Sequence, residues 1–179
     1  MEISGTKWAT RNVGLPGAFV ENPEDMGMLY QWNRIIGWSG IDPMINSNGS
    51  TDWDDSINES NTWERTNDPC PPGWRIPTTD EAIALVNSDS QYTTINEVGG
   101  RIVGIGENTI FIPDVYTRDS DGTLKKLIMS NYWCSNALFI DNDYRDCYFG
   151  FSDKIIETFA KGKTAIAFSV RCVLDTEAP

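Results

Sequence analysis

The chain is built from short runs of alternating apolar and polar residues, separated by clusters of glycine, asparagine, aspartate and proline. Alternation with a period of two is typical of a strand that buries one face. The last run, residues 165–172, shows the pattern most clearly, because Ile166, Phe168, Val170 and Cys172 fall on one side. We expect this segment to be a strand with one face in the core, in a fold dominated by antiparallel strands.

Other segments with similar patterning predict further strands. They lie at residues 7–11, 101–104, 109–113, 132–135 and 144–151. A different spacing is found at Leu29, Trp32, Ile35 and Ile36, which follow a helical period up to Gly37. We therefore expect a short amphipathic helix in that region.

A second helix is predicted by a capping box at Thr78 and Glu81, in which each side chain binds the backbone amide of the other residue. Ile83 and Leu85 supply its apolar side. We expect this helix to run from about residue 79 to about 87. Short antiparallel strands with two helices give an expected fold class of α+β.

The 179 residues suit a single domain, and no repeat divides residues 1–179. Between about residues 38 and 68 the sequence turns polar, and only isolated tryptophans interrupt it. A structureless segment of that length is uncommon, so we interpret it as a long insertion that is either anchored by Trp53 and Trp63 or functional. Trp8, Trp32 and Trp74 are expected in the core.

Charge and composition exclude several classes of function. The formal net charge is −12, with no cluster of lysine or arginine, so nucleic acid and anionic membranes are poor partners. The chain contains no histidine, which excludes Ser-His-Asp and Cys-His nucleophile systems and histidine-ligated zinc. No apolar run is long enough to span a membrane, so we expect no membrane insertion by this domain.

The four cysteines are Cys70, Cys134, Cys147 and Cys172, and none forms a Cys-x-x-Cys pair. Two disulfides would fit an exported domain, whereas four buried thiols would fit a cytoplasmic one. The residues alone leave both readings open.

Six strings, in order along nearly the whole chain, resemble the FISUMP or major paralogous domain family. The CPPGWRIPT part of the third string, residues 70–78, and the final string are the most specific. The strings are WATRNVG (8–14), YQW (30–32), NDPCPPGWRIPT (67–78), IFIP (110–113), YWCS (132–135) and FSVRCV (168–173).

The resemblance implies a C-type-lectin-like fold, in the branch that includes formylglycine-generating enzymes. It also implies a surface protein of Gram-negative gut bacteria, in which this domain is the C-terminal part of a longer lipoprotein or fimbrial subunit. In such a fold the capped helix packs on the last strand, which implies a disulfide between Cys70 and Cys172. Cys134, where the family has serine, is expected either to pair with Cys147 across a hairpin or to be a variable position.

A narrower resemblance is to the variable proteins of diversity-generating retroelements, which use a similar scaffold with a Tyr-Trp-x-Ser element and a similar final strand. Their variation falls between those two elements, and adenine mutagenesis of asparagine codons yields a recognisable set of residue types. Residues of that set here are Asn131, Asn136, Phe139, Ile140, Asn142, Asp143, Tyr144, Cys147 and Tyr148.

Residues 131–151 mix aromatic rings with asparagine, serine and aspartate, a composition found in protein surfaces that recognise ligands. We expect a binding face there, assisted by the insertion around Trp53. The predicted ligand-binding residues are Asn131, Tyr132, Asn136, Phe139, Asp141, Asn142, Asp143, Tyr144, Asp146, Tyr148 and Phe151.

Two acidic clusters, at residues 52–55 and 141–146, make calcium conceivable. Neither has the glycine and terminal glutamate of an EF-hand, and the sugar-binding motifs of calcium-dependent lectins are missing, so we expect no cofactor. A formylglycine-generating type of oxidase would need partly exposed, reactive thiols at Cys134 and Cys147. We expect no enzyme, with that oxidase and a purely structural domain as the alternatives.

The sequence therefore predicts an adhesion or receptor-recognition module of a bacterial cell surface, outer membrane or fimbria. Its expected partner is a protein or glycan on a host or neighbouring cell. The export signal is expected outside this chain, because residues 1–5 do not begin a signal-peptide pattern.

Overall fold

The computed structural model describes residues 1–176 and corrects the expected fold class. Strands account for 39% of the described residues and helices for 6%, and these residues contain one α-helix rather than two. The fold is therefore mostly β, and the α+β class is wrong. The helices are the 3₁₀ turn η1 (Arg65–Asn67) and α1 (Thr79–Val86).

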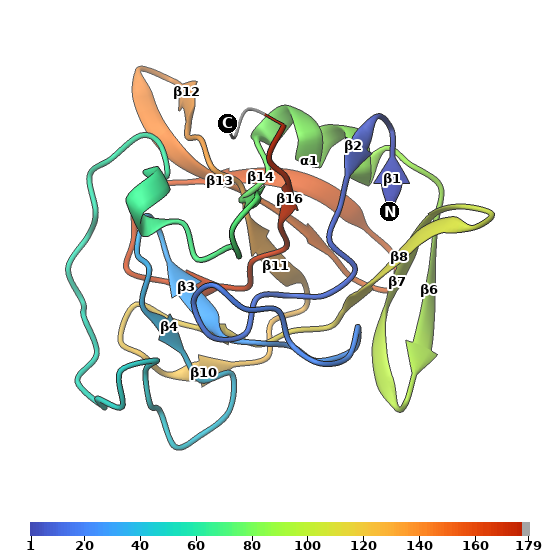
Figure 1. Cartoon of the computed structure of the whole chain (residues 1–179). Helices are drawn as coiled ribbons and strands as arrows, with labels where there is room; N and C mark the ends of the chain where they lie inside the picture. Colours follow the sequence, from blue (N-terminus) through green and yellow to red (C-terminus); the bar gives the residue numbers. More distant parts are fainter. Residues whose placement is uncertain (177–179) are drawn as a thin grey trace.

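Within residues 1–176, sixteen short strands make up several antiparallel sheets (Figure 1). They are β1 (Glu2–Ile3), β2 (Thr6–Lys7), β3 (Leu29–Gln31), β4 (Gly37–Trp38), β5 (Trp74–Arg75), β6 (Ser90–Ile95), β7 (Val98–Ile105), β8 (Asn108–Pro113), β9 (Thr117–Arg118), β10 (Leu124–Lys125), β11 (Ser130–Trp133), β12 (Leu138–Ile140), β13 (Asp143–Phe151), β14 (Ile156–Lys161), β15 (Ala167–Phe168) and β16 (Val173–Leu174).

Strand β13 organises the largest part of the fold, because it pairs with β11 and β12 along one edge and with β14 along the other. Helix α1 packs on β13 and β14. A second sheet has the order β10-β9-β15-β3-β4, and a third is the meander β6-β7-β8. The backbone of Ser169, just after β15, bonds to β11 and so joins the first two sheets.

The helix expected near residue 29 is absent, and its residues form β3, a turn and β4. Leu29 and Tyr30 pair with β4, while Tyr30 and Gln31 pair with β15. Asn33 then adopts a left-handed backbone with φ of +52°, which a continuous helix does not allow. Tertiary strand pairing has therefore overridden the helical spacing.

Helix α1, in contrast, confirms the second prediction. Thr78 is its N-cap, and the reciprocal bonds of the capping box with Glu81 are both present. Asn87 ends the helix as the C-cap, in agreement with the expected boundary.

The last predicted strand is only partly a strand, and it buries both faces. Regular pairing is confined to β15 and β16, yet every residue from 165 to 173 is buried. Arg171 illustrates the reason, because its guanidinium reaches the carbonyls of Ala9 and Phe111 inside the molecule. The alternation therefore separates two interior faces rather than a core face from a solvent face.

Residues 39–64 form no helix and no named strand, although this whole segment is described. Figure 1 shows the segment running along one side of the molecule, from β4 to the 3₁₀ turn before β5. Trp53 packs against Trp38 in a tilted arrangement with ring centroids 4.8 Å apart, and Trp63 is buried against Trp32. Both tryptophans therefore anchor the insertion, the first of the two roles considered for them.

Candidate functional site

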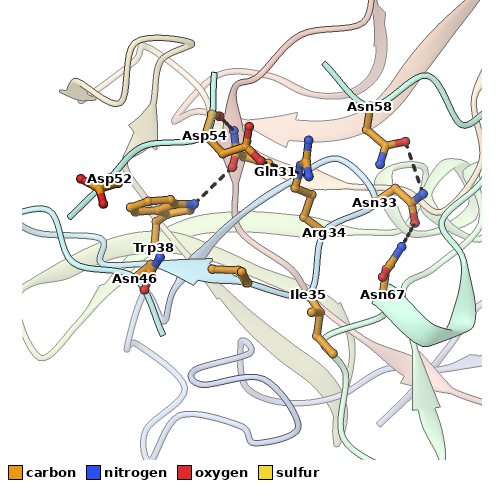
Figure 2. Close-up of a pocket in the computed structure, with 11 residues that line it drawn as sticks. Gln31, Asn33, Arg34, Ile35, Trp38, Asn46, Asp52, Asp54, Asn58 and Asn67 are labelled. Carbon is orange, nitrogen blue, oxygen red and sulfur yellow. Dashed lines mark hydrogen bonds and ion pairs between the residues drawn. The ribbon is translucent and has the colours of Figure 1, made fainter. Parts of the chain in front are cut away.

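A pocket of about 280 Å³ lies between the β3–β4 turn and the polar insertion. Its size is close to the lower end, about 300 Å³, of the pockets that hold small ligands. Figure 2 shows three groups of side chains around it. Trp38, Asn46 and Asp52 lie at one end, Asn33, Asn58 and Asn67 at the other, and Gln31, Arg34, Ile35 and Asp54 between them.

Gln31 and Trp38 form a rigid inner wall of the pocket. The Gln31 amide donates to the carbonyls of Asp54 (2.6 Å) and Ala165 (2.9 Å), and its Oε1 accepts a bond of 3.2 Å from the Trp38 indole. Both side chains are 2% exposed. Strands β3 and β4 thus hold this wall in place, and the insertion is tied to it through Asp54.

Asn33 fixes the opposite end of the pocket. Its Oδ1 accepts bonds from the Glu64 amide (2.8 Å) and from the side chain of Asn67 (3.1 Å), and its Nδ2 donates to Asn58 Oδ1 at 3.4 Å. The buried side-chain amide of Asn33 therefore binds three positions of the insertion, at residues 58, 64 and 67. The left-handed backbone of Asn33 places this side chain beneath the insertion rather than along β3.

Arg34 and Asp54 bring opposite charges to the centre of the pocket. The Arg34 guanidinium contacts Asp54 Oδ2 at 3.0 Å and donates to Ser56 Oγ at 2.6 Å. Burial raises the pKa of Asp54, but hydrogen bonds from Ser56 and the charge of Arg34 outweigh it and hold that pKa below its usual value. Asp54 is therefore an ionised acceptor at neutral pH.

Several polar groups that line the pocket have no partner among the described residues. They are the carboxylate of Asp52, the Nδ2 groups of Asn46 and Asn58, and the Nε of Arg34. The Oδ1 atoms of the two asparagines are already occupied by backbone amides of the insertion. Each asparagine is thus oriented by its oxygen and leaves its two N–H donors for a ligand.

The structure exposes only part of the predicted binding face. Phe139, Asp141, Asn142, Asp143 and Tyr144 are exposed on the hairpin between β12 and β13. The rings of Phe139 and Tyr144 lie 5.0 Å apart, and the turn residues Asp141 and Asn142 both have positive φ, as a type I′ hairpin turn requires. The displayed surface is therefore a hairpin tip rather than the whole segment.

The other predicted binding residues are turned inward, which corrects their assignment to a binding face. Asn131, Tyr132, Asp146 and Phe151 are buried. They lie on β11 or β13, whose two faces are covered by α1 and neighbouring strands on one side and by the aromatic cluster around Trp133 on the other. The aromatic and polar side chains of this segment do form contacts, but with other residues of the core rather than with a ligand.

Asn136 and Tyr148 are half-buried and also serve the fold. Asn136 Oδ1 accepts a bond of 2.8 Å from the backbone amide of Thr79, at the first turn of α1. Tyr148 packs between Phe159 and Phe168, with ring centroids 5.4 and 4.9 Å away. Neither side chain is available to form a flat recognition surface.

The cysteines occupy two separate places in the core. Cys70 and Cys172 are joined in a disulfide, the pairing that the family resemblance implied. Cys134 and Cys147 are unbonded thiols, both 0% exposed, and neither lines the pocket. A substrate therefore cannot reach these two thiols without movement of the surrounding core.

The two acidic clusters do not converge on a common centre. Asp54 is paired with Arg34, Asp141 lies 3.6 Å from Arg145, and Asp146 points into the interior. Among residues 1–176, no group of three or more histidine, cysteine, aspartate or glutamate side chains is placed to hold a metal ion. Within the same range, no helix has the length and apolar character needed to cross a membrane.

Comparisons with protein-family models, curated proteins and solved structures give no match. Function is therefore inferred from the site alone.

Most residues of the pocket were not among those predicted from sequence. Gln31 and Asn33 lay in a segment expected to be helical, and the asparagines of the insertion were indistinguishable from turn formers. The available signal was the density of asparagine and aspartate in a segment that also carries anchoring tryptophans. That signal located the insertion as a possible functional element but did not identify its partners on β3 and β4.

Proposed function

We propose that this domain is a non-catalytic binding module whose pocket takes a neutral, hydroxyl-rich group of about the size of one sugar ring. The observation that carries the proposal is the set of unpartnered donors and acceptors around a rigid wall. Amide N–H groups from Asn46 and Asn58 and the carboxylate of Asp52 match the mixed donor and acceptor character of sugar hydroxyls. A glycan on a neighbouring or host cell is the partner class that supplies such groups.

Charge supports a neutral ligand over an anionic one. The pocket is lined by two carboxylates, Asp52 and Asp54, and by one guanidinium, Arg34, which is already engaged by Asp54. The whole chain carries a formal charge of −12, so an acidic sugar would be repelled both locally and at long range. Neutral glycans are therefore the expected ligands.

The fixed geometry of the pocket supports binding without induced folding. Gln31, Asn33 and Trp38 are nearly fully buried and hydrogen-bonded, so little side-chain entropy is lost when a ligand enters. The exposed Phe139–Tyr144 pair on the hairpin is not among the residues that line the pocket. Asn61 and Trp63 form backbone hydrogen bonds to the base of that hairpin, and in sequence they lie between Asn58 and Asn67, which line the pocket.

The proposed setting is a bacterial cell surface, as part of a longer adhesive or receptor-recognition chain. The disulfide between Cys70 and Cys172 supports an oxidising compartment, because such bonds rarely persist in the cytosol. The resemblance to FISUMP domains and to retroelement-diversified proteins remains a prediction that agrees with this setting. An enzymatic role of the formylglycine-generating type gains no support from the buried position of Cys134 and Cys147.

A glycan array followed by titration calorimetry tests the proposal. We expect the protein to bind neutral glycans and to show no binding to their sialylated counterparts. Asp52→Asn removes a pocket carboxylate that has no structural partner, so the fold should be unchanged. The asparagine still accepts a hydrogen bond, so the variant loses only the charge assistance, about 1 kcal/mol, and affinity should fall by about fivefold.

Asp143→Asn is the matched control, because it removes the same charge from an exposed position on the hairpin. This variant should bind neutral glycans as tightly as the original chain. The proposal is wrong if no neutral glycan binds, or if Asp143→Asn weakens binding while Asp52→Asn leaves it unchanged.

A further inference from the structure

Cys134 and Cys147 lie opposite each other on two neighbouring strands. The register pairs Trp133 on β11 with Tyr148 on β13, so the next pair along the two strands is Cys134 and Cys147. The backbone N–H of Cys134 donates to the carbonyl of Cys147 at 2.9 Å, which extends the ladder by one step. Directly opposite residues of an antiparallel pair have Cα atoms about 4.5–5.5 Å apart, within the range of about 4.4–6.8 Å found in disulfides.

The two thiols also interact with each other inside the core. Their side chains are close enough to hydrogen-bond, and both sulfur atoms belong to the same apolar cluster beneath α1. Burial raises the pKa of Cys134, so this thiol is unreactive once the core has formed. The disulfide-bonded Cys70 and Cys172 belong to the other core cluster, which keeps the two cysteine pairs apart in the folded chain.

We propose that Cys134 and Cys147 are a second disulfide site, which is oxidised while the chain folds in a compartment that supplies a disulfide oxidant. The thiolate of one cysteine attacks the oxidant's disulfide and releases one thiol from it. The second cysteine, losing its proton, then displaces the remaining thiol from the mixed disulfide. The two cysteine sulfurs lose two electrons and two protons in total, and the oxidant is reduced to two thiols.

The bond would close the loop that carries the displayed hairpin. Residues 135–146 lie between the two cysteines and include β12, the turn at Asp141 and Asn142, and the exposed rings of Phe139 and Tyr144. In the structure strand pairing, bonds to residues 61–63 and bonds of Ser135 and Asn136 to the start of α1 hold this loop to the body of the protein, and all except the strand pairing lie at its base. A covalent link at its base therefore restricts the orientation of the exposed aromatic pair.

Oxidative refolding tests the inference directly. The chain is reduced in denaturant, refolded with oxidised and reduced glutathione, and alkylated after renewed denaturation without reductant. We expect no alkylated cysteine, an intact mass lower than that of the reduced chain by four hydrogen atoms, and a proteolytic peptide pair linked through Cys134 and Cys147. Alkylation at both of these cysteines, or their linkage to Cys70 or Cys172, would overturn the proposal.

Two double variants complete the experiment. The variant with Cys70→Ala and Cys172→Ala should still form the bridge between Cys134 and Cys147, because the two bonds form independently. Two free thiols in this folded variant would argue against the proposal.

In the variant with Cys134→Ala and Cys147→Ala, the amide hydrogens of residues 138–145 should exchange at least several-fold faster than in the oxidised original chain. Equal exchange rates would contradict the restricting effect on the hairpin, and the mass and peptide results on the original chain decide the bond even if a variant fails to fold.

Discussion

At the scale of single residues, the most informative side chains are polar groups buried in the interior. Arg171 is fully buried, and its guanidinium donates to Asn12 Oδ1 at 2.8 Å and to the carbonyls of Ala9 and Phe111 at 3.1 Å. Burial lowers its pKa to about 10, which leaves it charged at neutral pH. One side chain thus satisfies three acceptors from two separate segments of the chain.

Asp146 contrasts with Arg171, because neither of its buried carboxylate oxygens has a hydrogen-bond partner in the part of the chain that the structure describes. Burial raises its pKa from 3.8 to about 7, an effect that the charge of Lys163 opposes and that of Glu59 reinforces. Between pH 4 and pH 7 the folded chain therefore holds a proton that the unfolded chain has lost. This group stabilises the fold fully below about pH 4, and the contribution is lost as pH rises through 7.

Asp146→Asn should remove that dependence while keeping the shape of the side chain. The shift of about three pKa units corresponds to at most about 4 kcal/mol. We expect the variant to be more stable than the original chain at pH 8 by a few kcal/mol, and equally stable near pH 4. Urea unfolding at pH 4, 6 and 8 measures this, with the exposed Asp143→Asn as the control. A variant less stable at pH 8 would show that Asp146 is held in its ionised form.

At the scale of elements, α1 shows what local sequence can determine. Its N-cap, its capping box and its length were all predictable, because the contacts that define them lie within four residues of each other. The segment from Leu29 to Gly37 shows the opposite case. Its apolar spacing suited a helix, but pairing with β15, more than 130 residues away in sequence, made it a strand.

The capping box also gives a direct test of how much α1 depends on its first turn. Thr78→Ala removes the hydroxyl that accepts from the Glu81 amide, a loss of about 1 kcal/mol. For a chain of this size the melting temperature should fall by about 2–4 °C, whereas Thr78→Ser should restore most of it. Calorimetric melting of the three proteins decides the point. Equal melting temperatures for the alanine and serine variants would mean that the cap contributes nothing.

The hairpin of β12 and β13 explains why the predicted binding face was too large. Alternation and an aromatic-rich composition described β13 correctly as a strand, but they did not reveal that strands and α1 would cover both of its faces. Its side chains are exposed at Asp143 and Tyr144, where β13 pairs with β12 but is not covered by β14. How much of β13 is covered by other elements depends on the whole fold, so the alternation within the strand does not predict it.

At the scale of the whole molecule, the disulfide between Cys70 and Cys172 links segments 102 residues apart in sequence. It joins the residues before β5 to those before β16, which pair with each other. Replacing both cysteines with alanine should lower the free energy of unfolding by about 4–5 kcal/mol in the chain-entropy model. Denaturant unfolding of the variant beside the oxidised original chain measures the difference. A loss below about 1 kcal/mol would mean that the unfolded chain gains little freedom when the bond is removed.

The pocket also belongs to the scale of the whole molecule, which is why sequence reasoning did not find it. Its lining comes from β3, β4, the turn between them and several separate parts of the insertion. Each residue taken singly resembles a turn former or a core residue. These residues are brought together by contacts with the insertion that are distant in sequence, including the hydrogen bonds of Gln31 and Asn33 and the ion pair of Arg34 with Asp54.

Nuclear magnetic resonance of the side-chain nitrogens tests the central claim most directly, because the proposed ligand contacts are themselves N–H groups. As a neutral monosaccharide is added to ¹⁵N-labelled protein, the side-chain signals of Asn46, Asn58 and Arg34 Nε should shift together and saturate with one dissociation constant. The backbone signals of residues 138–145 should move little with so small a ligand. If the signals of the pocket side chains stay unchanged with every neutral sugar tested, the pocket is not the binding site and the account is contradicted.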